Sequence, residues 1–266
     1  MGTSLSKGAL ACLIVPSLQF LAIPWGDKTS VNQLSDKGRV PNLSTIYLTL
    51  ACMDADAKSP QGLSRFLEAN SQMTSLTLSY IPSVELLSSA ITALHSSRKL
   101  KGISLSWRGD DIPSAFITEL SHLPQVETLH INAAFAVASP RWWFVNHDEV
   151  RRSLRGLTSL KRLIIQGDTY PLVEETEHRW FTSERYYDYR KPRNEFWIMH
   201  EDRMHEHALE YVRLLPNLEF IHIGQVLYTV ERIHGSRSPV VTGSAWCGDP
   251  RHDIFKEEFG FTEHFG

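Results

Sequence analysis

Residues 216–223 read Pro-Asn-Leu-Glu-Phe-Ile-His-Ile, and residues 41–48 read Pro-Asn-Leu-Ser-Thr-Ile-Tyr-Leu. In both stretches a proline stands two residues before an apolar position, and further apolar positions follow three and five residues after that one. Proline ends a helix and suits a turn, whereas short apolar patterns with polar residues between them are typical of strands. The two stretches therefore predict a helix stop followed by a short strand.

The same apolar pattern occurs seven times, with spacings of 25 to 34 residues and one spacing of 58. The seven copies are Leu18, Leu21, Ile23; Leu43, Ile46, Leu48; Met73, Leu76, Leu78; Leu100, Ile103, Leu105; Val126, Leu129, Ile131; Leu160, Leu163, Ile165; and Leu218, Ile221, Ile223. The apolar pattern alone is common in a chain that is 42% hydrophobic. However, four copies begin Pro-polar-apolar-polar, where the composition alone predicts fewer than one. The chain therefore contains an internal repeat.

Helical apolar patterns occupy residues 63–67, 84–94, 116–123 and 208–215, and each precedes a strand pattern. Units of helix, proline stop and strand that are too small to bury their own apolar face stack on one another. We therefore predict an α/β solenoid, with parallel strands on its concave face and helices on its convex face. A doubly wound α/β domain is the alternative, because its parallel strands also appear as short apolar runs.

Over residues 16–223 the phrase P-x-L-x-x-L-x-I resembles the irregular repeats of fungal F-box and leucine-rich-repeat proteins. The resemblance implies a horseshoe that selects a protein substrate. The chain lacks the Asn or Cys that the family places eight residues after the first leucine to bond its turns. We therefore expect its turns to be held in another way. Because only fifteen residues precede Pro16, too few for a three-helix F-box, direct docking to a ubiquitin ligase is not expected.

The domain prediction is a solenoid over residues 1–223 and a C-terminal cap over residues 224–266. An aromatic-rich insertion at about 166–199 interrupts the repeat, and the cap begins with a strand pair at 226–230 and 238–241. The apolar residues 10–15 lie at the N-terminal end of the stack. Self-association through this edge is predicted unless a partner covers it.

Composition excludes several classes of partner. The net charge of -3 leaves no basic footprint for nucleic acid, and the apolar N-terminal run is too short to span a membrane. Cys12, Cys52 and Cys247 form no CxxC motif and are odd in number, which indicates free thiols in a reducing compartment. The predicted location is therefore the cytoplasm or the nucleus.

Side chains between the core positions of the strands point to the concave face. The larger ones are Tyr47, His130, Arg162 and His222, which we predict to contact a protein partner on an otherwise smooth floor. The insertion combines aromatic residues with arginines, a composition typical of interaction hot spots. From it we select Trp180, Tyr186, Tyr187 and Arg190 as further partner-binding residues.

Motifs for catalysis are scarce. The chain has no GxSxG, GxGxxG or GxxxxGK[ST] sequence. Residues 200–207 are rich in His and carboxylates but lack HExxH spacing, so we interpret them as a solvated first helical turn. The sequence thus favours a non-enzymatic protein-binding chain without metal or cofactor. Two alternatives stay open, namely a small-molecule-binding protein or enzyme that uses His130 or His222, and a truncated remnant without activity.

Overall fold

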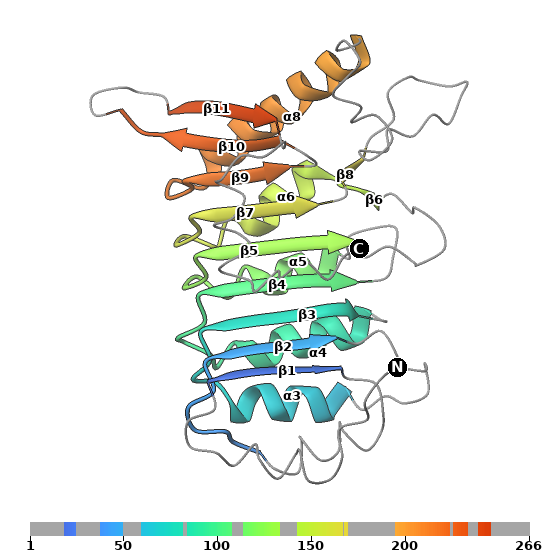
Figure 1. Ribbon diagram of the computed structural model, residues 1–266, viewed down its shortest axis with the longest axis vertical. Coiled ribbons are helices and arrows are strands. Elements are labelled where there is room, and N and C mark those ends of the chain that lie inside the picture. The colour runs from blue at the N-terminus through green and yellow to red at the C-terminus, as the bar shows by residue number, and fades with distance from the viewer. Residues whose placement is uncertain are drawn as a thin grey trace.

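The computed structural model describes residues 19–24, 38–49, 60–81, 84–107, 114–133, 143–166, 168–169, 195–223, 226–233 and 239–245. Over these ranges the chain is an α/β protein with a nine-stranded, mostly parallel sheet and five helices (Figure 1). The α/β class agrees with the sequence prediction. None of the described helices is long and apolar enough to cross a membrane.

The strands of the large sheet follow one another in chain order. They are β1 (Phe20–Pro24), β2 (Thr45–Thr49), β3 (Ser75–Ile81), β4 (Gly102–Trp107), β5 (Thr128–Ala133), β7 (Arg162–Gln166), β9 (Phe220–Ile223), β10 (Val226–Glu231) and β11 (Val240–Ala245). β1 to β9 are parallel, whereas β10 and β11 are antiparallel, which confirms the predicted strand pair. This order lacks the reversal that defines a doubly wound sheet.

Each helix lies in the sequence between two consecutive parallel strands of the sheet. The helices are α3 (Pro60–Ala69), α4 (Val84–Leu94), α5 (Ser114–Leu120), α6 (His147–Leu154) and α8 (Glu195–Leu214). A second, two-stranded sheet pairs β6 (Trp143–Phe144) with β8 (Asp168–Thr169). β8 lies at the start of the predicted insertion. Through its pairing with β6, the start of the insertion is hydrogen-bonded to the segment between β5 and α6.

The second and third apolar positions of all seven predicted patterns lie in strands that share one register. Their second apolar positions form one continuous row across the sheet: Leu21, Ile46, Leu76, Ile103, Leu129, Leu163 and Ile221. Every side chain in this row is buried. Because side chains alternate along a strand, a shared register directs every row of core residues to the same face of the sheet.

The helices cover one face of the sheet (Figure 1). The main apolar core combines the strand rows with helix residues such as Leu63, Leu87 and Ile91. Ile164 and Leu227 belong instead to a separate small cluster, against which Phe220 packs. The sheet therefore has one face packed on helices and one face that none of the described helices covers, which we call the helix-free face.

Before the parallel strands β2, β3, β4, β5, β7 and β9 the backbone makes a four-residue turn. The amide of Leu218 donates to the carbonyl of Leu215 over 3.1 Å, and the amide of Val126 donates to that of Leu123 over 3.0 Å. Pro216 and Pro124 therefore occupy the second position of their turns, where the fixed φ of proline is favoured. After α5 and α8 the proline thus both stops the helix and shapes the turn.

Side-chain amides hold these turns to one another. The amide groups of Gln125 and Asn217, one residue after the prolines, donate to the carbonyls of Ser97 and Thr158 in the preceding unit, over 3.0 and 2.7 Å. Asn70, which is fully buried, accepts a hydrogen bond from the Val40 amide over 2.8 Å. Side-chain amides on the turns before the strands thus bond neighbouring units, which explains the polar residues Gln125 and Asn217 after Pro124 and Pro216.

Arg232, directly after β10, makes the equivalent bonds for the last unit. Its guanidinium donates to the carbonyls of Leu218 and Leu215, the latter over 3.4 Å. The carbonyls of the turn before β9 therefore accept side-chain hydrogen bonds, as those of earlier turns do. They receive them from Arg232, although the strands that follow β9, β10 and β11, are antiparallel.

Two helices differ from the prediction, because α6 matches none of the four predicted helical patterns and α8 is longer than expected. α8 begins at Glu195, so residues 200–207 lie in its middle, and their interpretation as a first helical turn is wrong. Met204, Ala208 and Tyr211 are fully buried at helical spacing, which shows that the apolar stripe of α8 continues one turn earlier than predicted. The acidic residues near Met204 made this part of the sequence look solvent-exposed, so its buried side was not predicted.

Candidate functional site

The helix-free face carries the side chains between the core positions. They include Thr45 and Tyr47 of β2, Ser75 and Thr77 of β3, Ser104 of β4, Thr128 and His130 of β5, Arg162 and Ile164 of β7, and Phe220 and His222 of β9. Strand register places Tyr47, His130 and His222 in one row and Arg162 in the adjacent row. The structure therefore brings these four predicted residues onto one face.

Position on this face does not make a residue accessible. His130 and His222 each expose 3% of their surface, and Thr77 and Ser104 each expose 4%. The predicted partner contacts His130 and His222 are therefore buried side chains, because strand alternation assigns a side chain to a face but does not tell whether the side chain is accessible there. Tyr47 and Arg162 are partly exposed.

His130 has a close neighbour on this face. Its Nδ1 lies 2.9 Å from the hydroxyl of Ser104, its register partner on β4. Tyr47 lies three strands away, about 14 Å at the usual strand spacing. The two histidines are thus buried sheet residues, and Tyr47 belongs to a different, N-terminal part of the face.

Trp180, Tyr186, Tyr187 and Arg190, selected from the insertion, lie outside the described residues. The apolar residues 10–15 of the predicted self-association edge also lie outside them. Both predictions stay predictions.

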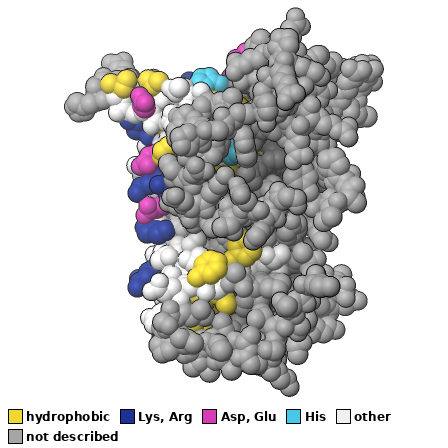
Figure 2. Space-filling model, viewed as in Figure 1, with side chains coloured by type: hydrophobic (Ala, Val, Ile, Leu, Met, Phe, Trp, Pro, Cys, Tyr) yellow, Lys and Arg dark blue, Asp and Glu magenta, His cyan; other side chains and the backbone are white. Residues whose placement is uncertain are grey.

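Charged side chains form a ladder along the edge where the parallel strands begin. Lys101 and Lys161 both pair with Glu127, at 2.6 and 2.9 Å, and Glu219 follows in the next unit. The two lysine hydrogen bonds, first that of Lys101, lower the pKa of Glu127, and Glu127 raises the pKa of Lys161. Figure 2 shows dark blue and magenta side chains alternating in a column at this edge. Equivalent positions of stacked units lie side by side, so alternating signs avoid repulsion.

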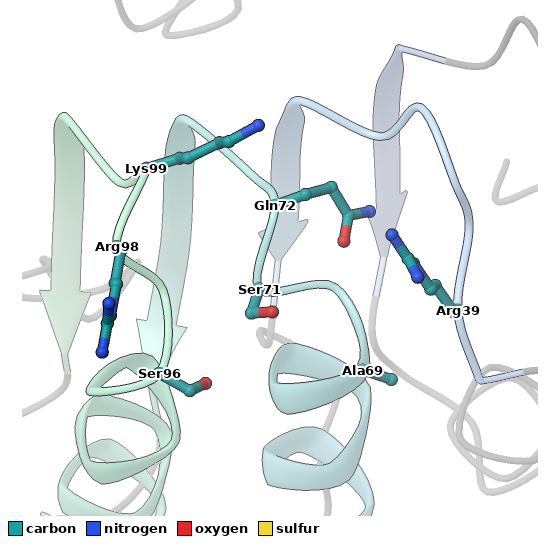
Figure 3. Close-up of a pocket in the computed structure, with 7 residues that line it drawn as sticks. All are labelled: Arg39, Ala69, Ser71, Gln72, Ser96, Arg98 and Lys99. Atoms are coloured by element: carbon teal, nitrogen blue, oxygen red, sulfur yellow. The ribbon is translucent and has the colours of Figure 1, made fainter.

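A basic hollow lies further along this edge, among the turns that precede β2, β3 and β4 (Figure 3). It has a volume of about 330 Å³ and is lined by Arg39, Ala69, Ser71, Gln72, Ser96, Arg98 and Lys99. The three cationic side chains are exposed, and the lining contains no carboxylate. In Figure 3, Arg39 and Gln72 point toward each other from neighbouring turns. The hollow therefore suits an acidic group of a partner.

A second polar cluster lies between α6 and α8. The rings of His147 and His207 stack with centroids 3.9 Å apart, and Nδ1 of His147 lies 3.0 Å from the hydroxyl of Tyr211. Arg151 donates to Nδ1 of His207 over 3.3 Å. Burial, then the proximity of His147 and Arg151, lowers the pKa of His207 to about 3. His207 is therefore a neutral packing group near neutral pH, and His147 packs against it.

Sequence reasoning missed two groups of residues that the turns bring together. One is the basic hollow. The other is His95, Glu119 and His122, whose ligand atoms all lie within 4.8 Å of one another on the helix side. Aligning the units would have found the basic hollow, because its members occupy equivalent positions near the turns of successive units, and would have placed His95 and His122 one position apart.

The comparisons with known proteins assign no family. No protein-family model matches the chain, and no curated protein matches it in sequence. The resemblance to F-box and leucine-rich-repeat proteins accordingly stays a prediction.

Proposed function

We propose that the protein is a leucine-rich-repeat-like solenoid that binds another protein and does not itself catalyse a reaction. The supporting observation is the arrangement of its seven parallel strands, which follow chain order and share one register. Stacked units of this kind present long continuous surfaces instead of a single deep site, and repeat proteins use such surfaces for binding.

The N-terminal end of the helix-free face is the proposed contact surface. Phe20 of β1 exposes 54% of its surface. Tyr47 lies on the neighbouring strand β2, two residues after Thr45, the register partner of Phe20. Partly exposed aromatic side chains are typical anchors of protein interfaces. The cations of the basic hollow lie nearby, Arg39 in the turn before β2 and Arg98 and Lys99 in the turn before β4, so a partner with an apolar anchor and an adjacent acidic segment fits this end best.

The burial of the two face histidines supports binding over catalysis. An enzyme that uses His130 or His222 needs its substrate to reach an imidazole, and both side chains are almost fully buried. The histidine with a pKa of about 3, His207, lies among the helices instead. Substrate selection similar to that of F-box proteins is the specific role that we propose for this binding surface.

The test uses the tagged full chain, expressed in cells of its source, with proteins captured and quantified by mass spectrometry. The double variant Phe20→Ala/Tyr47→Ala is expected to lose a specific partner at least about tenfold relative to the unchanged chain, because hot-spot anchors contribute more than 1 kcal/mol each. Direct binding of the purified partner then confirms the contact.

Ile233→Ala is the matched control, because Ile233 is a similarly exposed apolar residue at the other end of the sheet, 58% exposed. It should retain every partner. Retention of all partners by a folded Phe20/Tyr47 double variant would contradict the proposed surface.

A further inference from the structure

The ends of α4 and α5 bring together two imidazoles and one carboxylate. His95 follows the last residue of α4, while Glu119 and His122 lie in and just after the last turn of α5. α4 and α5 are neighbours in the row of helices (Figure 1). The two histidines are 27 residues apart, close to one repeat unit, so stacking of the units places them side by side.

The ligand atoms of these side chains converge. Oε2 of Glu119 lies 3.5 Å from Nε2 of His95 and 3.8 Å from Nδ1 of His122. The two imidazole rings stand at 88° to each other with centroids 5.4 Å apart. In a tetrahedral zinc site with bonds of 2.0–2.2 Å, neighbouring ligand atoms are about 3.3–3.6 Å apart. Small side-chain rotations would therefore bring all three atoms onto one ion.

The surroundings favour a cation at this point. The carbonyl ends of α4 and α5 both lie here, and helix C-termini attract positive charge. The amides of His95 and His122 donate to the carbonyls of Thr92 and Glu119 over 3.2 and 3.1 Å, which holds both histidines on ordered turns. The three side chains are 34% to 59% exposed, so an ion and a water ligand can reach them from solvent.

We propose that His95, Glu119 and His122 form a zinc site that joins the helix ends of two successive units, with the fourth position of the metal open to water. Imidazole nitrogens select zinc and its transition-metal neighbours over Mg²⁺ and Ca²⁺, which prefer oxygen ligands. An open fourth position is also one that a side chain of a bound partner could occupy.

The test titrates Zn²⁺ into the full, tag-free, metal-free chain by calorimetry. One ion should bind per site, and Glu119→Gln and His122→Ala should each weaken binding at least about tenfold. Zn²⁺ should raise the Tm of the unchanged chain and leave that of His122→Ala unchanged. Co²⁺ should give the visible absorption bands of tetrahedral coordination, and Mg²⁺ should show no binding.

His205→Ala is the matched control, since His205 belongs to the other histidine-rich segment, on α8. It should bind Zn²⁺ as the unchanged chain does. Circular dichroism establishes that each variant is folded, and Glu119→Gln preserves the shape of the side chain. Absence of zinc binding, or binding that survives both Glu119→Gln and His122→Ala, or binding that only His205→Ala removes, would overturn the proposal.

Discussion

Two junctions between neighbouring helices contain pairs of histidines in opposite surroundings. At the α4–α5 junction, His95 and His122 are exposed and face the carboxylate of Glu119. At the α6–α8 junction, His147 is buried and stacks on His207, which lies against the guanidinium of Arg151. The first set suits a bound cation, whereas in the second burial and nearby positive charge lower the pKa of His207. The comparison teaches that the residues around a histidine pair, and not the pair itself, decide what it does.

Truncation of one histidine at each junction should show the largest difference. His147→Ala opens a cavity and removes the hydrogen-bond partner of the Tyr211 hydroxyl, so it should lower the free energy of unfolding by about 2–4 kcal/mol. His122→Ala in the absence of metal should change it by less than about 0.5 kcal/mol. Urea denaturation measures both values, and similar losses in the two variants would remove the distinction between the junctions.

The α5–α6 junction connects the two clusters and depends on a glycine. A Cβ at Gly156 would lie within van der Waals overlap of the backbone carbonyl oxygen of Ser121, at 2.2 Å. Gly156→Ala should therefore destabilise the protein by about 1–3 kcal/mol, measured as a lower Tm. Because Ser121 stands between Glu119 and His122, the variant should also weaken the proposed zinc site.

Arg155→Ala, an exposed neighbour in the same turn, is the control for Gly156→Ala. It should leave both the Tm and zinc binding close to those of the unchanged chain. An unaltered Tm in Gly156→Ala would show that the junction is looser than the structure indicates.

The buried junction should respond to acid. The pKa of His207 is about 3 in the folded chain against 6.5 for an ordinary histidine. The unfolded chain therefore binds more protons between these values, and stability should fall as the pH decreases from 6.5 toward 3. His207→Gln should show a smaller decrease in Tm between pH 7 and pH 4 than the unchanged chain. His205→Gln should retain the full decrease, and an identical decrease in all three proteins would contradict the assignment.

The charged ladder should give the smallest effect. Glu127→Gln removes the carboxylate that pairs with Lys101 and Lys161 and should cost at most about 1 kcal/mol, because these side chains are exposed. The loss of stability should disappear in 1 M salt, where the Debye length is only about 3 Å. Since the pKa of Glu127 is lowered, its contribution is present above pH 4.5 and lost as the pH falls through its folded pKa. A cost that is independent of salt would indicate lost packing instead.

The repeat was predictable because its signals are local. Proline after a helix and apolar residues three and five positions apart are properties of short segments, and all seven predicted strands occur in register. The polar residue after each proline was visible as a pattern, yet its role became clear only when Gln125 and Asn217 were seen to bond the preceding turn.

The sequence by itself determined which residues form the strands, which of their positions face the helices, and where the chain turns. Only the tertiary structure decided that His130 and His222 are buried, that α8 extends back to Glu195, and that His95 lies beside Glu119 and His122. The physical reason is that periodicity assigns a side chain to a face, whereas its accessibility and its neighbours depend on segments far away in the sequence.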